Sequence, residues 1–211
     1  MATRYLPTGA ATTGFAVIRR IAWWPDDLDY VVTGHLGPRR TRTPIGMPIY
    51  QPRVAPGNEA GTVEAVGRMH GFADVARVGI ANRDVVPYIH IGGGSRIPVR
   101  SWRDAHWPEW VSKSGAATGD TQGRVVTRQP IKVWNPALGS LQNQVLAAYA
   151  SAGGDSGSPV FLFGPTGGVY AVIVGIHWGR APCPITGIDR ATFSPISGIM
   201  TELSGWEPHT K

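Results

Sequence analysis

Short apolar runs separated by turn-forming residues restrict the fold of this chain more than any other sequence feature. Glycine occurs 28 times and proline 18 times in 211 residues, so the chain has many points at which it can turn. β-Branched and aromatic side chains fill the runs between them, for example in Tyr30–Val32 and Val160–Phe163. Such runs are typical of strands joined by tight turns. The sequence therefore predicts an all-β barrel or sandwich rather than a helical protein.

One segment near the C-terminus breaks this pattern and is expected to be helical. Ser194 and Pro195 stand before residues 196–203 as helix-start signals do, and Gly205 follows. Hydrophobic residues make up 42% of the chain, which is enough to form a core. We therefore expect one compact unit or two small lobes, mostly β, with a short helix near the end.

The charge and the cysteine content limit the partners and the compartment that we expect. The net charge of +6 comes mainly from scattered arginines, with one run at residues 39–42. Without a longer basic stripe interleaved with aromatic residues, specific nucleic-acid binding is not favoured, although a basic surface could attract acidic substrates. Cys183 is the single cysteine, residues 1–7 hold no apolar leader, and no run reaches membrane-spanning length. We expect no internal disulfide and no membrane association, and favour a cytoplasmic over a secreted location.

Residues 154–160 read Gly-Asp-Ser-Gly-Ser-Pro-Val and carry the clearest chemical signal. Gly154 can adopt positive φ, so consecutive backbone N–H groups can turn toward one point. Ser156 then presents its hydroxyl beside those donors, as a nucleophile beside an oxyanion hole requires. The competing interpretation is an ordinary Gly/Ser turn between strands. The segment resembles the nucleophile motif of chymotrypsin-like serine endopeptidases, a resemblance that predicts a histidine and then an aspartate earlier in the chain.

Two upstream segments supply candidates for these two residues. Residues 32–35 read Val-Thr-Gly-His at the end of a β-branched run, similar to the strand that carries the family's catalytic histidine. A solvated loop histidine is the alternative for His35. Asp74 stands at the start of an alternating apolar strand and would accept a hydrogen bond from the His35 ring. Asp84 competes with it, but is better explained as a turn residue.

Two later segments extend the resemblance. Residues 113–125 resemble the strand-turn-strand that opens the second barrel of many bacterial and viral relatives, and residues 174–179 resemble the strand beside the specificity pocket. The chain departs from the family at Leu36, where many relatives have a disulfide cysteine, and at Arg77, where an apolar residue is usual. The resemblance spans about residue 13 to about residue 204.

The resemblance implies a division into two six-stranded antiparallel β-barrels. Residues 1–95 would form the first barrel, which carries the histidine and the aspartate. Residues 109–211 would form the second barrel, which carries the serine, the specificity pocket and the C-terminal helix. Residues 96–108 would be the linker between them.

The resemblance also places the walls of a substrate pocket, in residues 150–153 and 176–180. No acidic residue lies on either wall, which argues against a preference for Lys or Arg. The predicted substrate-binding residues are Ser151, His177, Trp178, Gly179 and Arg180. The pattern is similar to bacterial glutamyl endopeptidases, in which a histidine at this strand position and a hydroxyl residue on the other wall bind the substrate carboxylate. Alternatively, His177 is buried and supports Asp74, which would leave a neutral pocket for mid-sized apolar residues.

The family chemistry assigns a role to each candidate. Ser156 would be the nucleophile, His35 the general base and Asp74 the group that orients it, with the N–H groups of Gly154 and Ser156 as the oxyanion hole. By resemblance, Asp155 is a buried carboxylate that shapes the oxyanion loop, and its partner is left open. The resemblance thus implies a serine endopeptidase acting on a protein or peptide.

Other functions remain open at this point. A domain of this fold could bind a protein partner without cutting it, as an adaptor or pseudoenzyme, or could be a processing enzyme that cuts a single partner. Neither a metal nor a cofactor is expected, because no His/Cys/Asp cluster in the sequence has metal-ligand spacing.

Overall fold

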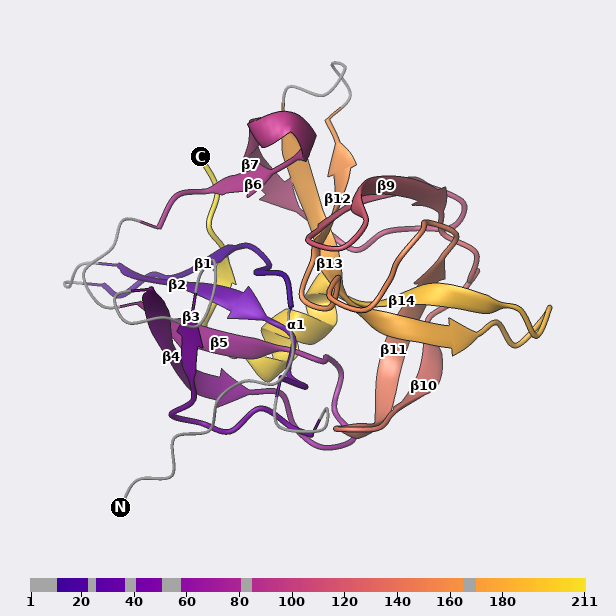
Figure 1. The fold of residues 1–211 in the computed structure, drawn as a ribbon, viewed down its shortest axis with the longest axis horizontal. Coiled ribbons are helices and arrows are strands. Elements are labelled where there is room, and N and C mark those ends of the chain that lie inside the picture. The colour runs from indigo at the N-terminus through magenta and orange to yellow at the C-terminus, as the bar shows by residue number, and fades with distance from the viewer. Residues whose placement is uncertain (1–10, 23–25, 37–40, 51–57, 81–84, 165–169) are drawn as a thin grey trace.

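The computed structural model describes residues 11–22, 26–36, 41–50, 58–80, 85–164 and 170–211 (Figure 1). Two curved β-sheets dominate this part of the chain, and one α-helix, α1 (Ile196–Glu202), follows the last long strand. The prediction of an all-β protein with a short C-terminal helix is confirmed. In the described residues, no helix is long and apolar enough to cross a membrane.

The first sheet contains six antiparallel strands, in the order β15-β1-β2-β5-β4-β3. Its strands are β1 (Ala16–Arg19), β2 (Asp27–Val32), β3 (Pro48–Tyr50), β4 (Glu59–Val66), β5 (Ala76–Gly79) and β15 (Glu207–Pro208). Period-two burial is clearest in β5, where Ala76 and Val78 face the core while Arg77 forms an ion pair with Asp29 on β2. The C-terminal strand β15 pairs with β1, so the end of the chain closes one edge of this sheet.

The second sheet contains nine strands. Seven lie in the order β10-β11-β14-β13-β12-β8-β9, and the hairpin of β6 and β7 joins them through β13. The strands are β6 (Tyr88–His90), β7 (Arg96–Trp102), β8 (Trp110–Gly115), β9 (Gly119–Arg124), β10 (Ile131–Asn135), β11 (Gly139–Ala147), β12 (Pro159–Phe163), β13 (Ala171–Pro182) and β14 (Asp189–Pro195).

The segment expected to link the barrels contains a strand. Residues 96–102 form β7, which pairs antiparallel with β6 and parallel with β13. Ile97 and Val99 are buried on one face of β7, which explains why the segment is ordered as a strand. The barrel boundaries at residues 95 and 109 stay predictions.

One hydrophobic cluster joins the two sheets. Phe15 and Val31 from the first sheet pack in the same cluster as Phe161 and Ile176 from the second, and α1 contributes Ile199. Figure 1 shows α1 between the two sheets, near the centre of the molecule. A shared core of this kind fixes the two sheets relative to each other, which matters because the candidate site draws on both.

Candidate active site

Three side chains far apart in the sequence meet between the two sheets. His35 lies just after β2, Asp74 just before β5, and Ser156 in the turn that leads into β12. His35 Nδ1 lies 2.5 Å from Asp74 Oδ2, and His35 Nε2 lies 3.2 Å from Ser156 Oγ. The Asp74 side chain is fully buried, and that of His35 is 15% exposed. The first sheet thus positions the histidine and the aspartate, and the second positions the serine.

These contacts determine which ring nitrogen of His35 carries the proton. An ionised carboxylate only accepts hydrogen bonds, so Nδ1–H must donate to Asp74. Nε2 is then unprotonated and can accept the Ser156 proton. Ser156 Oγ also lies 3.2 Å from the Trp178 carbonyl oxygen. Since a hydroxyl has one proton, it donates either to His35 or to this carbonyl at any instant.

Four groups donate to the Asp74 carboxylate. Oδ1 accepts from the Gly34 N–H at 2.6 Å and from Thr33 Oγ1 at 3.0 Å. Oδ2 accepts from His35 and from Asn135 Nδ2, the latter at 2.7 Å. Gly34 is required here, since an added Cβ would lie 2.9 Å from Asp74 Oδ1. The carboxylate is therefore held by donors on both of its oxygens.

The backbone around Ser156 leaves two donors free. Gly154 has a φ of 103°, a conformation that side chains disfavour. The Asp155 and Gly157 N–H groups donate to the Ala152 and His177 carbonyls. Within the described part of the chain, the Gly154 and Ser156 N–H groups have no hydrogen-bond partner. Two unpaired N–H groups beside a serine hydroxyl are what an oxyanion hole requires.

Asp155 has a buried partner, Lys113 on β8. Lys113 Nζ lies 3.2 Å from Asp155 Oδ2, and both side chains are fully buried. The carboxylate also accepts hydrogen bonds from the Ala117, Thr118 and Ala152 N–H groups and from the Thr118 hydroxyl. Burial acts to raise the pKa of Asp155, but these hydrogen bonds prevail and lower it to about 2. Asp155 is therefore ionised at neutral pH. It ties residues 152–157, the oxyanion loop, to the turn between β8 and β9.

The segment before β1 also holds the oxyanion loop. Thr12 N–H donates to the Ser156 carbonyl at 2.8 Å, and Thr12 Oγ1 donates to the Gly154 carbonyl at 3.0 Å. The same hydroxyl accepts the Ala116 N–H at 2.9 Å. Thr12 thus bridges the oxyanion loop and the end of β8.

The predicted pocket residues differ in where their side chains lie. Ser151 Oγ is buried and has no hydrogen-bond partner among the described residues. The Trp178 side chain is buried in the core, and its Nε1–H donates to Gln144. Gly179 is half-buried, while Arg180 is exposed and donates to the Asp189 carbonyl at 3.0 Å. Of the two predicted walls, the one before the nucleophile therefore offers an unsatisfied polar atom.

His177 is 1% exposed and lies in the core of the second sheet. Its Nδ1 lies 3.2 Å from the hydroxyl of the buried Tyr149, and the two rings meet edge to face. Burial is the main cause that lowers the pKa of His177 to about 3, and the positive charge of Lys113 adds to it. The ring is therefore neutral at neutral pH. Its hydrogen-bond partners are the Tyr149 hydroxyl and the Thr192 backbone rather than Asp74.

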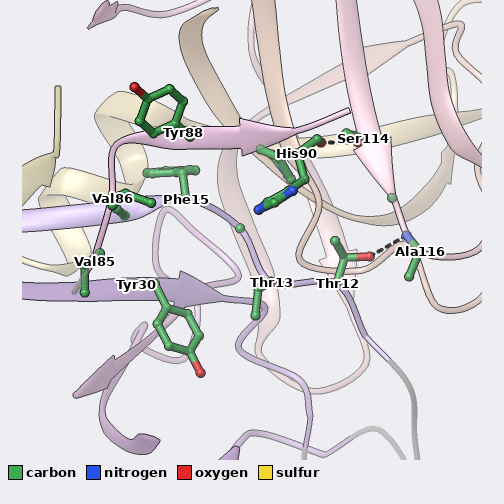
Figure 2. A pocket seen from close by; sticks show the side chains of 14 residues that line it. Thr12, Thr13, Phe15, Tyr30, Val85, Val86, Tyr88, His90, Ser114 and Ala116 are labelled. Carbon is green, nitrogen blue, oxygen red and sulfur yellow. Dashed lines mark hydrogen bonds between the residues drawn. The ribbon is translucent and has the colours of Figure 1, made fainter. Parts of the chain in front are cut away.

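A cavity of about 380 Å³ lies between β1, β2, β6 and β8. Figure 2 shows side chains that line it, among them Phe15 just before β1, Tyr30 on β2 and His90 on β6. No member of the His35–Asp74–Ser156 group is among the described residues that line it. Thr12 and Ala116, which are bonded to each other, form part of its wall and connect it to the oxyanion loop.

Sequence reasoning missed three residues of this site. Asn135, Lys113 and Tyr149 are partners of Asp74, Asp155 and His177 respectively. Lys113 lies between two serines in β8, so its sequence neighbours give no sign that this lysine is buried and needs an anion. For Asn135 the sequence suggests only a turn before Pro136. No group of metal-binding side chains occurs in the part of the chain that the structure describes.

Neither a protein-family model nor a curated protein matches this sequence. Solved structures do match. Thermobifida fusca protease A is 22% identical, with a TM-score of 0.72, over 98% of this chain and 95% of that one. A glutamic acid specific serine protease, described as using a histidine triad in substrate binding, is 22% identical, with a TM-score of 0.70, over 94% and 93%. Cellulomonas bogoriensis chymotrypsin is 21% identical, with a TM-score of 0.66, over 98% of each chain. The chain therefore has the chymotrypsin-like serine protease fold.

Proposed function

We propose that this protein is a serine endopeptidase that cleaves peptide bonds through an acyl-enzyme on Ser156. The observation that carries the proposal is the hydrogen-bonded series Ser156–His35–Asp74 beside the two unpaired N–H groups of Gly154 and Ser156. A serine hydroxyl alone is a weak nucleophile, and this series supplies the base that it needs.

The reaction follows from the positions of these groups. Ser156 Oγ attacks the carbonyl carbon of the substrate while its proton moves to His35 Nε2. The carbonyl oxygen becomes negative and is held by the two free N–H groups. The C–N bond then breaks as His35 returns the proton to the leaving amine. Water attacks the acyl-enzyme and gives a proton to His35, which passes that proton to Ser156 as the acid product leaves. Asp74 stays ionised throughout and stabilises the imidazolium.

For the residue before the cleaved bond, we infer an acidic or apolar side chain rather than Lys or Arg. No acidic residue lies in 150–153 or 176–180 to pair with a basic side chain. The Ser151 hydroxyl, which has no partner among the described residues, and the exposed Arg180 favour an acidic residue. The core position of His177 and its bond to Tyr149 favour an apolar residue, because they occupy the ring away from substrate.

A peptide library tests both parts of this proposal. Wild-type protein should cut a defined subset of peptides, and the Ser156→Ala variant should cut none. Glutamate or aspartate before most cleavage sites would support recognition of the substrate carboxylate by Ser151. Mid-sized apolar residues at that position would support a neutral pocket in which His177 does not contact substrate. If the folded wild type cuts no peptide and forms no acyl-enzyme with an activated ester, the endopeptidase proposal is wrong and a binding role takes its place.

A further inference from the structure

Asn135 stands at the end of β10 and reaches across to the other sheet. It is 1% exposed, and its Nδ2 lies 2.7 Å from Asp74 Oδ2. That oxygen is the one that accepts the His35 Nδ1 proton at 2.5 Å. Asn135 and His35 therefore donate hydrogen bonds to the same carboxylate oxygen, and both stabilise its negative charge.

The orientation of the Asn135 amide is fixed by its own turn. Its Oδ1 accepts the Ala137 N–H at 2.8 Å and the Leu138 N–H at 3.0 Å. A flipped amide would oppose NH₂ to these two donors and carbonyl oxygen to the Asp74 carboxylate. Both contacts would be repulsive, so Nδ2 must face Asp74.

The hairpin that carries Asn135 is docked on the segment that precedes Asp74. His70 N–H donates to the Leu138 carbonyl at 2.7 Å, and Ser140 N–H donates to His70 Nδ1 at 3.1 Å. The hairpin of β10 and β11 therefore holds the position of Asn135 relative to the first sheet. A change in the packing of the two sheets would move the amide away from the carboxylate.

Other polar groups near Asp74 have different partners. Trp178 Nε1 and Ser194 Oγ both donate to Gln144 Oε1, at 2.8 and 2.9 Å. Ser194 Oγ also accepts the Asp74 N–H, at 2.9 Å, so it holds the backbone of the aspartate rather than its carboxylate. From the second sheet, Asn135 is the residue that donates to the carboxylate within the described part of the chain.

We propose that Asn135 is a positioning residue that fixes the Asp74 carboxylate from the second sheet. Its hydrogen bond also weakens the stabilisation that this carboxylate gives to the His35 imidazolium. This proposal rests on the proposed function, since it gives Asn135 a role in keeping His35 a free base. A neutral donor disperses the negative charge of the carboxylate. Without that donor the imidazolium is stabilised more strongly, so His35 stays protonated to higher pH and a smaller fraction of the protein carries His35 as a free base at neutral pH.

Two substitutions and a control separate positioning from folding. Asn135→Ala removes the donor but also the acceptor for the turn. Asn135→Asp keeps an acceptor for the turn and replaces the donor by a second carboxylate oxygen. His70→Asn is the control, because it removes the side-chain acceptor of the Ser140 N–H but keeps the backbone bond from His70 to Leu138, so the hairpin stays docked and Asn135 stays in place. Asparagine also tolerates the φ of 56° at that position.

The readouts are the rate of fluorophosphonate labelling as a function of pH and the NMR titration of the His35 ring. His177 on β13 is a titratable group of the second sheet that interacts with His35, and its pKa of about 3 keeps it neutral near neutral pH. We expect labelling at pH 7 to fall about ten- to a hundredfold in Asn135→Ala, mostly because the Asp74 carboxylate is no longer held in place. The midpoint of the acidic limb should rise by about half a pH unit or more, and further in Asn135→Asp, where a second negative charge stabilises the imidazolium. His70→Asn should keep the wild-type midpoint.

The proposal is overturned if both Asn135 variants keep the wild-type midpoint and lose labelling only in proportion to their unfolded fraction. It is also overturned if neither variant folds while His70→Asn does, because Asn135 is then a structural residue of the hairpin. If wild-type protein takes no label at any pH, the endopeptidase proposal fails instead. The NMR midpoints of His35 in wild type and variants would still decide whether Asn135 acts on the His35–Asp74 pair.

Discussion

Two buried aspartates near Ser156 are held in contrasting ways. Asp155 precedes Ser156 in the chain, and Asp74 is linked to it through His35. Asp74 and Asp155 are both fully buried, and each accepts four hydrogen bonds. The basic partner of Asp74 is the His35 ring. The basic partner of Asp155 is Lys113, although burial lowers the Lys113 pKa from its usual value.

The donors differ as well. Asp155 draws three of its four hydrogen bonds from backbone N–H groups, of residues 117, 118 and 152. Asp74 draws three of its four from the side chains of Thr33, His35 and Asn135. Both kinds of donor stabilise the charged carboxylate, but the backbone donors also tie three chain positions to Asp155. In the proposed mechanism, Asp155 therefore sets the structure of residues 152–157, and Asp74 sets the reactivity of His35 as the base.

The largest expected effect is that of Asp74→Asn. The amide would favour the wrong His35 tautomer, so we expect turnover to fall by about 10⁴-fold. Its NH₂ group would also face donors that the carboxylate accepts, so the unfolding temperature should fall as well. Steady-state cleavage and a thermal melt would check this. A loss of less than tenfold would mean that Asp74 does not orient the base.

Lys113→Met should act mainly on stability. It leaves Asp155 buried without its cation, and the free energy of unfolding should fall by about 3 kcal/mol. Lys113→Arg is the matched control, because it keeps the charge. Urea unfolding of the three proteins gives the comparison, and equal stability of wild type and Lys113→Met would show that the hydrogen bonds alone hold Asp155.

Acid should weaken the structure around Asp155. Its pKa is about 2 in the folded protein against an ordinary value of 3.8, so its charged form stabilises the fold above pH 3.8. This contribution, roughly 2 kcal/mol, should be lost as the pH falls from about 4 to about 2. The stability difference between wild type and Asp155→Asn, measured by urea unfolding at several pH values, should shrink over that range. A difference that stays constant from pH 5 to pH 2 would contradict the assignment.

The smallest expected effect is that of Tyr149→Phe. It removes the hydrogen bond to His177 in the core and should cost about 1 kcal/mol of stability without changing turnover. The peptide library makes this variant informative. If the cleavage preference shifts between acidic and apolar residues, the His177 ring takes part in substrate recognition, and its placement as a core residue alone is wrong.

The strands and the three central residues could be predicted because their signals are local. The Gly-Asp-Ser-Gly motif, the Thr-Gly-His end of β2 and the aspartate before β5 each occupy a few consecutive residues. Asn135 and Lys113 could not be found in this way. Asn135 is 61 residues from Asp74 along the chain, and their contact depends on how the hairpin of β10 and β11 docks on the first sheet.

The strand β7 shows a similar limit. Glycines and tryptophans around residues 92–107 indicate a connection when the sequence is read locally. Ile97 and Val99 become a buried face only when β7 lies beside β13. Pairing with β13 therefore determines that this segment is a strand, which its local sequence alone does not indicate.

The most direct test of the account is to react the folded protein with a fluorophosphonate and to locate the adduct by peptide mass spectrometry. The account predicts a single adduct on Ser156 in wild-type protein, and none in Ser156→Ala or His35→Ala at matched concentration and time. An adduct on another residue, or a folded wild type that takes no label, would contradict the claim that His35, Asp74 and Ser156 form an assembled catalytic site.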